Sequence, residues 1–218
     1  MRLVILLVVA WCGVARAGVC LSDEEREADM RLVEAYAKDR SAGGRVDEAY
    51  GWLCVSGQPK LATRVRAACE TILDRDGDKR DGGLHPCVIA AAASGVATLG
   101  KHDLFALIGT MTEDPIESDG GVGFTKTGLL GRMGDPRGAN VIVDMWKAAI
   151  PRAEAREKHH GHMADWSSWR QLAALSLGMV GDADTAAFLR EQSKATVDTH
   201  VRDACLDAAT AIDKRSHR

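Results

Sequence analysis

Apolar side chains recur along most of the chain three and four residues apart, which is the spacing of an amphipathic α-helix. This spacing predicts helices over about 22–40, 46–57, 61–72 and, in an alanine-rich segment, 86–99. The second of these carries its apolar face at Val46, Ala49, Tyr50, Leu53 and Cys54. Alternation of polar and β-branched residues, the pattern of a half-buried strand, is nearly absent. The sequence therefore predicts an all-α protein.

The first predicted helix begins with a capping box. The Ser22 hydroxyl can accept a hydrogen bond from the backbone N–H of Glu25, while the Glu25 carboxylate accepts one from the N–H of Ser22. This local chemistry predicts a helix start at residue 22 or 23.

A self-similar phrase recurs in the second half of the chain. The clearest copy reads W-R-x-x-A-A-x-x-L-G-x-x-G-D from Trp169 to Asp182. An earlier copy starts at Val122 and ends in L-G-x-x-G-D at 130–135, and a shortened copy, L-G-K-H-D, lies at 99–103. A further copy begins V-R-x-A-C at Val201.

The end of the phrase predicts a tight turn between two helices. Gly178 and Gly181 can take the left-handed conformation that ends a helix, and Asp182 can cap the first N–H groups of the next helix. Pro136 follows the earlier copy at a helix start, where its missing N–H costs nothing. Each copy is thus predicted to be a helix, a turn and a new helix.

With this phrase the chain resembles HEAT-repeat proteins, in the short-repeat form also found in phycobilin-lyase-like repeats, whose phrase is V-R-x-A-x-x-A-L-G-x-x-G-D. The resemblance covers roughly Val88 to the C-terminus. Gly123 and Trp169 depart from it, standing where the family carries arginine and valine. The resemblance implies a right-handed α-solenoid of stacked antiparallel helix pairs, about ten helices in all, and a protein-binding or scaffold function. A bilin lyase is another, less favoured function that the resemblance offers.

The first residues have the three parts of a secretory signal. A positive start at Met1-Arg2 precedes an apolar run from Leu3 to Val14, and Ala15-Arg16-Ala17 is a typical cleavage site. We expect residues 1–17 to be removed and the protein to be periplasmic or secreted. The apolar run is shorter than the ~20 residues of a membrane span, and no later segment approaches that length. An uncleaved anchor and lipid attachment at Cys20 are the alternatives.

The rest of the chain is predicted to have two regions. Residues 18–84 form an N-terminal helical region of degenerate repeats or a cap, and residues 85–218 form the HEAT-like repeats. The copies at Val122 and Trp169 lie farther apart than those at Trp169 and Val201. This difference predicts an insertion at about 151–165.

Composition narrows the function classes. Of the 218 residues, 46% are hydrophobic and 27% charged, which excludes a disordered chain, and a net charge of -3 argues against a nucleic-acid partner. Only 5% are aromatic, so the core is expected to consist of small residues.

Export would let the cysteines form disulfides. Cys12 leaves with the signal, so five remain, and an odd number leaves at least one thiol free or paired with another molecule. Cys205, on a helical stripe of small apolar residues, is expected to be a buried free thiol. Pairing among the others stays open: Cys20, Cys54, Cys69 and Cys87.

Two residue pairs in the repeats are candidate binding residues. Arg170 and Arg202 lie near the starts of two repeat helices, where each guanidinium could meet an aspartate of the next repeat or, alternatively, bind an anion. Trp166 and Trp169 lie three apart on one helical face. They could be a wedge in the core or an exposed aromatic anchor for a protein partner.

The predicted insertion holds three of the seven histidines. His159, His160 and His162 could bind a transition metal, with Asp165 as a fourth ligand or a partner of a ligand. The alternative is a solvated charged connection, since the spacing matches no standard zinc motif. A metal-binding protein or metalloenzyme built on these residues is the alternative to the protein-binding function; otherwise the sequence implies no cofactor.

Other chemistry is weakly indicated. The acidic run at 74–81 suggests a calcium loop, but Lys79 stands where the EF-hand turn needs glycine and His85 where it needs glutamate, so a polar loop is the alternative. His102 and Asp103 are interpreted as a turn residue and a helix cap. No catalytic motif is present, so we do not expect an enzyme.

Overall fold

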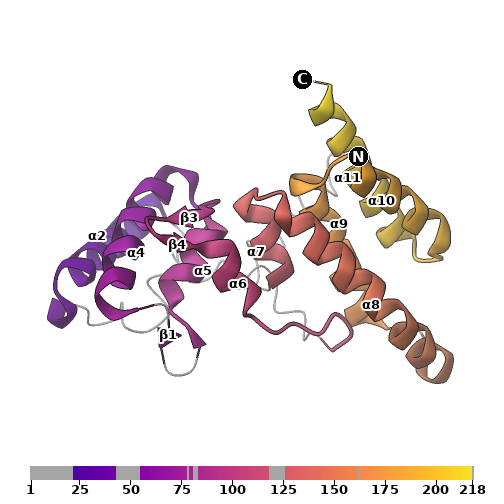
Figure 1. Ribbon diagram of the computed structural model, residues 1–218, viewed down its shortest axis with the longest axis horizontal. Coiled ribbons are helices and arrows are strands. Elements are labelled where there is room, and N and C mark those ends of the chain that lie inside the picture. The colour runs from indigo at the N-terminus through magenta and orange to yellow at the C-terminus, as the bar shows by residue number, and fades with distance from the viewer. Residues whose placement is uncertain are drawn as a thin grey trace. The chain divides into compact units, whose positions relative to one another are not determined.

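The computed structural model describes residues 22–42, 55–77, 79–80, 83–117, 126–161 and 163–217 (Figure 1). The described part of the chain is mostly helical, which confirms the all-α prediction. The predicted signal, most of the 46–57 helix, and Val122 and Gly123 lie outside these residues. The chain divides into two compact units: described residues up to Thr110 form unit 1, and those from Met111 onward form unit 2. The sequence predicts a boundary between two regions at residues 84 and 85 instead.

Unit 1 is a set of short helices with two small β-hairpins. Helix α2 packs on α4, α4 on α5, and α5 on α6. Strand β1 pairs with β2 and β3 with β4, both antiparallel. The elements are α2 (Asp23–Lys38), η1 (Arg40–Ala42), η3 (Pro59–Leu61), α4 (Ala62–Asp76), β1 (Lys79–Arg80), β2 (Gly83–Leu84), α5 (Pro86–Ala93), β3 (Thr98–Leu99), β4 (His102–Asp103) and α6 (Leu104–Gly109).

Local sequence signals account for several helix starts in unit 1. The predicted capping box of α2 is confirmed: Glu25 N donates to Ser22 Oγ over 3.1 Å, and Ser22 N donates to Glu25 Oε2 over 2.9 Å. Asp103 caps α6 by accepting from Phe105 N, as predicted. The apolar face that the spacing predicts for α4 is buried at Val65, Ala68, Cys69 and Ile72, and α2 buries Met30, Val33 and Tyr36.

The alanine-rich helix and the shortened repeat copy differ from the prediction. Helix α5 ends at Ala93 rather than near residue 99, and Gly95 follows with a φ of +80°. Residues 98–103 form the β3–β4 hairpin, whose turn places Gly100 at a φ of +53°. The L-G-K-H-D phrase is therefore a β-turn followed by a capped helix and not a short helical repeat.

Unit 2 contains longer helices. Helix α9 packs against both α7 and α11, while α8 contacts α7 and α9, and α10 packs mainly on α11. An aspartate lies just before α8 and before α10: Asp135 Oδ1 accepts from Arg137 N beside Pro136, the cap residue of α8, and Asp182 Oδ1 caps α10 by accepting from Thr185 N, as predicted. The helices are α7 (Lys126–Met133), α8 (Arg137–His160), α9 (Ala164–Val180), α10 (Ala183–Ala195) and α11 (Thr199–Ser216).

The core of unit 2 gathers aromatic side chains that the low overall aromatic content does not suggest. Trp146 of α8 makes edge contacts with Trp166, Trp169 and Phe188 at centroid distances of 6.4, 5.8 and 5.6 Å. The three tryptophans are at most 3% exposed. The expected core of small residues is found over most of unit 2, where many buried positions are alanine, and this one aromatic cluster departs from it.

The predicted insertion is mostly a continuation of a helix. Helix α8 runs through residues 151–160 with Pro151 inside it. The first part of this extension is tied to the 111–117 segment by ion pairs of Arg152 with Asp114 at 2.6 Å and of Arg156 with Glu117 at 3.1 Å. The extra residues therefore lengthen α8 instead of forming a loop.

The repeat glycines are explained by helix packing. Gly178 lies inside α9, and Gly181 has a φ of -74°, so the prediction of left-handed glycines at these positions is wrong. A Cβ at Gly178 would lie 3.2 Å from Ala208 of α11, and one at Gly131 only 2.6 Å from Cβ of Ser176 in α9. These glycines let neighbouring helices approach closely.

Candidate functional site

Both predicted tryptophan anchors are buried in unit 2. Trp166 and Trp169 are 3% and 2% exposed, and their rings stack with centroids 5.5 Å apart. The indole Nε1 of Trp169 donates to Glu113 Oε1 over 2.5 Å, and Glu113 Oε2 accepts from Thr127 N over 2.9 Å. The pair is placed as a core wedge and offers little surface to a partner.

Of the two predicted arginines, only Arg202 lies in the first turn of its helix; α9 begins at Ala164, so Arg170 lies in its second turn and the predicted helix-start position is wrong for it. The Arg170 guanidinium stacks over the Trp166 ring at 5.0 Å and donates to Thr196 Oγ1 over 3.2 Å. Burial lowers the pKa of Arg170, while Glu157 and Asp198 act to raise it. Arg202 is exposed and donates to the Thr196 carbonyl over 3.1 Å. Both side chains therefore hold the α10–α11 connection.

Asp198 in that connection is the cap of α11. It accepts from the backbone N–H groups of His200 and Val201 and from the Ser167 hydroxyl of α9. Burial raises its pKa, but the hydrogen bonds from Ser167, Val201 and His200, together with the charge of Arg170, lower it overall. Arg170 thus affects Asp198 through its charge, and its hydrogen bond goes to Thr196 instead.

The predicted metal ligands lie on both sides of the turn between α8 and α9. His159 is exposed in the last turn of α8, and Asp165 is exposed in the first turn of α9. The His160 side chain and the whole of His162 lie outside what the structure describes. Among the described residues, no group of three or more His, Cys, Asp or Glu side chains is placed to hold a metal ion.

The acidic run at 74–81 is held by ion pairs where it is described. Asp74 accepts from Lys101 Nζ over 2.9 Å, and Asp76 forms an ion pair with Arg75 at 2.7 Å. Asp78 and Asp81 lie outside the described residues. The described carboxylates of this run thus have protein partners.

A shallow, open hollow in unit 2 is formed by the segment before α7 and by α8. Its volume is about 350 Å³, and Arg152 and Asp114, joined by their ion pair, stand on its wall. The hydrogen bond from Ile116 N and the Arg152 guanidinium together hold the pKa of Asp114 below its ordinary value, against the effect of burial. The lining residues are Thr112, Glu113, Asp114, Pro115 and Arg152.

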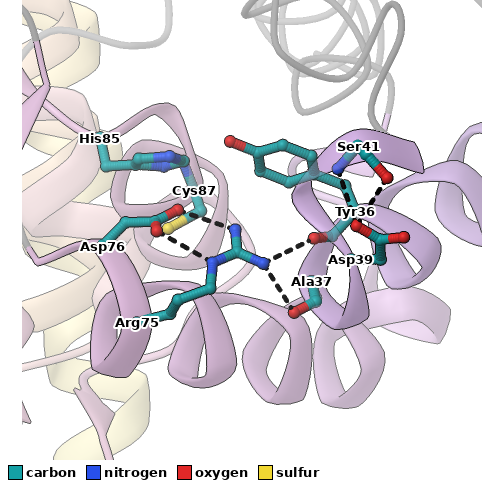
Figure 2. Close-up of polar contacts among 8 residues, drawn as sticks. All are labelled: Tyr36, Ala37, Asp39, Ser41, Arg75, Asp76, His85 and Cys87. Carbon is teal, nitrogen blue, oxygen red and sulfur yellow. Dashed lines mark hydrogen bonds and ion pairs between the residues drawn. The ribbon is translucent and has the colours of Figure 1, made fainter.

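A polar cluster in unit 1 was not predicted from the sequence (Figure 2). Arg75, in the last turn of α4, donates from Nη1 to the carbonyl oxygens of Tyr36 and Ala37 over 3.0 and 3.1 Å. Its guanidinium also lies over the Tyr36 ring at 5.2 Å and donates to both carboxylate oxygens of Asp76. Arg75 thereby satisfies the final carbonyls of α2.

His85 and Cys87 lie on the other side of Asp76 (Figure 2). His85 caps α5: its Nδ1 accepts from Cys87 N over 3.2 Å. Cys69 of α4 and Cys87 of α5 are both free, buried cysteines, and each affects the pKa of the other. The His85 side chain is only 2% exposed, and Cys69 and Cys87 are fully buried.

The neighbours of the two thiols separate their pKa values. Burial and the Cys87 thiol raise the pKa of Cys69 well above its ordinary value. Burial also raises the pKa of Cys87, but the interactions of its side chain with Cys69 and His85 outweigh burial and lower the pKa. Such a pair resembles a nucleophilic cysteine beside a histidine, yet a sulfur that solvent does not reach cannot meet a substrate.

The signals that could have found this cluster are weak. Cys69 was visible as one of the apolar positions of its helix, and Cys87 as the residue after a helix-starting proline, Pro86. Nothing in their spacing indicates that α4 and α5 pack at these two residues. The third cysteine that the structure describes, Cys205, is free and fully buried as predicted, and burial raises its pKa to about 12.

Within the described residues, none of the helices has the length and apolar character needed to cross a membrane. Comparisons of the chain with protein-family models, with curated proteins and with solved structures gave no match.

Proposed function

We propose that unit 2 is a HEAT-like, right-handed α-solenoid and that this exported protein uses it to bind another protein. The observation that carries the proposal is a repeated helix contact. Gly131 and Gly178 are the same glycine of the L-G-x-x-G-D phrase in two copies, and each faces a small residue of the next copy: Ser176 and Ala208.

Those two small residues are also equivalent. Ser176 stands seven positions after Trp169, where its copy starts, and Ala208 stands seven positions after Val201. The same pair of positions therefore meets at the α7–α9 contact and at the α9–α11 contact. Stacked repeats require such recurring contacts, because each unit buries its apolar face against the next one.

The exposed apolar side chains support a protein partner. In unit 2, Met179 is 55% exposed, Val197 93% and Leu206 44%, on α9, the α10–α11 connection and α11 respectively. The buried centres of protein interfaces are more apolar than their rims, and methionine is enriched there. Because Trp166 and Trp169 are buried, we place the binding surface at these three residues, which we call the α9–α11 surface.

Photo-crosslinking tests the proposal. A photoreactive amino acid replaces Leu206 in the full chain, which is expressed in its native host and crosslinked in the cell envelope. The matched control is Leu32 of unit 1, a leucine that is 41% exposed. We expect a discrete crosslinked protein from Leu206 and none from Leu32, and at least a tenfold loss of affinity for that purified protein in Leu206→Asp.

The same preparation tests export and specificity. The intact mass should correspond to a chain that begins at Gly18. Equal crosslinking from Leu32 and Leu206 would contradict the assignment of binding to unit 2. The photoreactive amino acid is also placed at Met179 and at Val197. If none of the three positions gave a discrete crosslinked protein, the protein-binding function would be rejected.

A further inference from the structure

The hollow between the segment before α7 and α8 carries more negative than positive charge on its wall. Its charged lining residues are Glu113, Asp114 and Arg152. Arg152 is already paired with Asp114 at 2.6 Å, so the charge of Glu113 is left over. The volume of about 350 Å³ lies at the small end of the range of ligand sites, roughly 300–1,000 Å³.

Glu113 is held in place by neutral donors. Its Oε1 accepts from the Trp169 indole over 2.5 Å, and its Oε2 accepts from Thr127 N over 2.9 Å. The ion pairs described for this segment belong to Asp114 and Glu117 instead. An ionised carboxylate has about four acceptor positions, so roughly two stay open on Glu113. Since both donors come from buried residues, they hold the carboxylate from the core side, and the hollow lies on its other side.

Thr127 gives an independent sign that a polar atom belongs to this network. The residue is 0% exposed, and within the described part of the chain its hydroxyl has no hydrogen-bond partner. Buried polar groups are nearly always hydrogen-bonded to protein or to ordered water. An unsatisfied hydroxyl on a residue that binds Glu113 therefore indicates that the network is incomplete without a further polar molecule.

We propose that the hollow binds an organic cation with N–H donors, a guanidinium or a primary ammonium, through Glu113. The planar fork of a guanidinium matches the geometry of a carboxylate. The group is either an arginine or lysine side chain of a bound peptide or part of a free cation. The site stands on contacts within unit 2 and does not rest on the proposed α9–α11 surface. A metal ion is disfavoured, because among the described residues no three His, Cys, Asp or Glu side chains are placed to hold one.

The Trp169 indole N–H reports on this site, because it donates to Glu113. Its resonance in the full chain is assigned by triple-resonance NMR and followed while ethylguanidinium chloride is added at low ionic strength. We expect a saturable shift with a Kd of roughly 1–10 mM, since the probe has few atoms. Tetramethylammonium, which has no N–H donor, and the acetate anion should give no saturable shift.

Two variants of the wall test the sign of the charge that is bound. Glu113→Gln keeps an oxygen for the Trp169 indole but removes the charge, so the affinity should fall roughly tenfold. Arg152→Gln removes a positive charge and frees Asp114, so the affinity should rise roughly twofold. Arg152 is 58% exposed, so this variant should fold even if Glu113→Gln does not.

A short peptide, acetyl-Ala-Arg-Ala-amide, identifies the source of the cation. Binding roughly tenfold tighter than that of ethylguanidinium would assign the group to a peptide partner. Equal binding of the two would assign it to a free cation.

Glu117→Gln is the matched control, because Glu117 is an exposed glutamate paired with Arg156 at 3.1 Å and does not line the hollow. Its Kd for ethylguanidinium should equal that of the wild type. The proposal would be overturned by the lack of a saturable shift, by an equal Kd in Glu113→Gln or by weaker binding in Arg152→Gln. A saturable shift with tetramethylammonium, acetate or Ca²⁺ in place of ethylguanidinium would overturn it as well.

Discussion

At the scale of single residues, the role of each repeat glycine depends on the residue that packs against it. The phrase L-G-x-x-G-D suggested a helix end, because glycine commonly ends helices in the left-handed conformation. In unit 2 that conformation is found at Gly134, with a φ of +70°, whereas Gly131 and Gly178 serve close helix contacts. Sequence pattern alone cannot separate the two uses, because the distance to the next helix is a tertiary property.

Gly131→Ala tests the close approach. The added Cβ would lie 2.6 Å from Ser176 Cβ and 2.7 Å from its Cα, so α7 and α9 must separate. We expect the free energy of unfolding to fall by about 1–3 kcal/mol, as for other overpacked cores. Urea unfolding followed by circular dichroism would measure it, because this signal reports on the helices of both units.

Gly109→Ala is the matched control. An added Cβ there has no heavy atom within 4 Å, and Gly109 is also helical, at the end of α6. We expect no loss of stability and at most a gain of about 1 kcal/mol. If both substitutions were equally tolerated, the close contact between α7 and α9 would be wrong.

At the scale of elements, the end of α2 is completed by a side chain from α4. Arg75 donates to the carbonyls of Tyr36 and Ala37 in the last turn of α2, and it is held in place by Asp76. A second arginine of α4, Arg64, joins the two helices by ion pairs of 2.7 Å. The α2–α4 contact thus combines a buried apolar face with a charged edge.

Arg75→Met should remove this cap while keeping much of the apolar stem. We expect unfolding to become easier by about 1–2 kcal/mol, since two charge-assisted hydrogen bonds to carbonyls are lost. Arg66→Met is the control: Arg66 pairs with Glu70 of its own helix at 3.0 Å and is half exposed, so its loss should cost about 0.5 kcal/mol or less. Urea unfolding followed by circular dichroism would compare them, and equal effects would show that the cap contributes nothing.

Elements could be predicted where the determining interactions are local. The caps at Ser22, Asp103 and Asp182 and the apolar faces of α2 and α4 follow from residues within a few positions of one another. The extension of α8 could not be predicted, because Pro151 usually ends a helix. The cluster of Arg75, His85 and the two thiols was also out of reach, because it is assembled by packing α2, α4 and α5 together.

At the scale of the whole molecule, carboxylates in both units are held in their charged form. The Arg75 guanidinium lowers the pKa of Asp76, Arg137 lowers that of Asp135, and the Thr185 N–H and hydroxyl lower that of Asp182. Burial opposes each of these shifts, but hydrogen bonds and ion pairs outweigh it. The same direction holds at Glu34, Asp114 and Asp198.

These shifts predict loss of stability in acid. Each folded-state pKa lies below its value in the unfolded chain, about 4, so the unfolded state binds more protons as the pH falls. The stabilisation is complete above about pH 5 and decreases as the pH falls through the folded-state values. The free energy of unfolding, measured in urea between pH 6 and pH 3, should therefore decline steadily below pH 5.

Asp182→Asn isolates one contribution: asparagine caps a helix nearly as well as aspartate, so stability at pH 6 should change by only a few tenths of a kcal/mol. Its decline below pH 5 should be shallower than that of the wild type, by less than about 1.4 kcal/mol per pH unit because Asp182 is exposed and solvent screens it. If the dependence of stability on pH were unchanged in Asp182→Asn, the acid sensitivity would belong to other carboxylates. A wild-type stability that rises below pH 5 would contradict the lowered pKa values of these carboxylates.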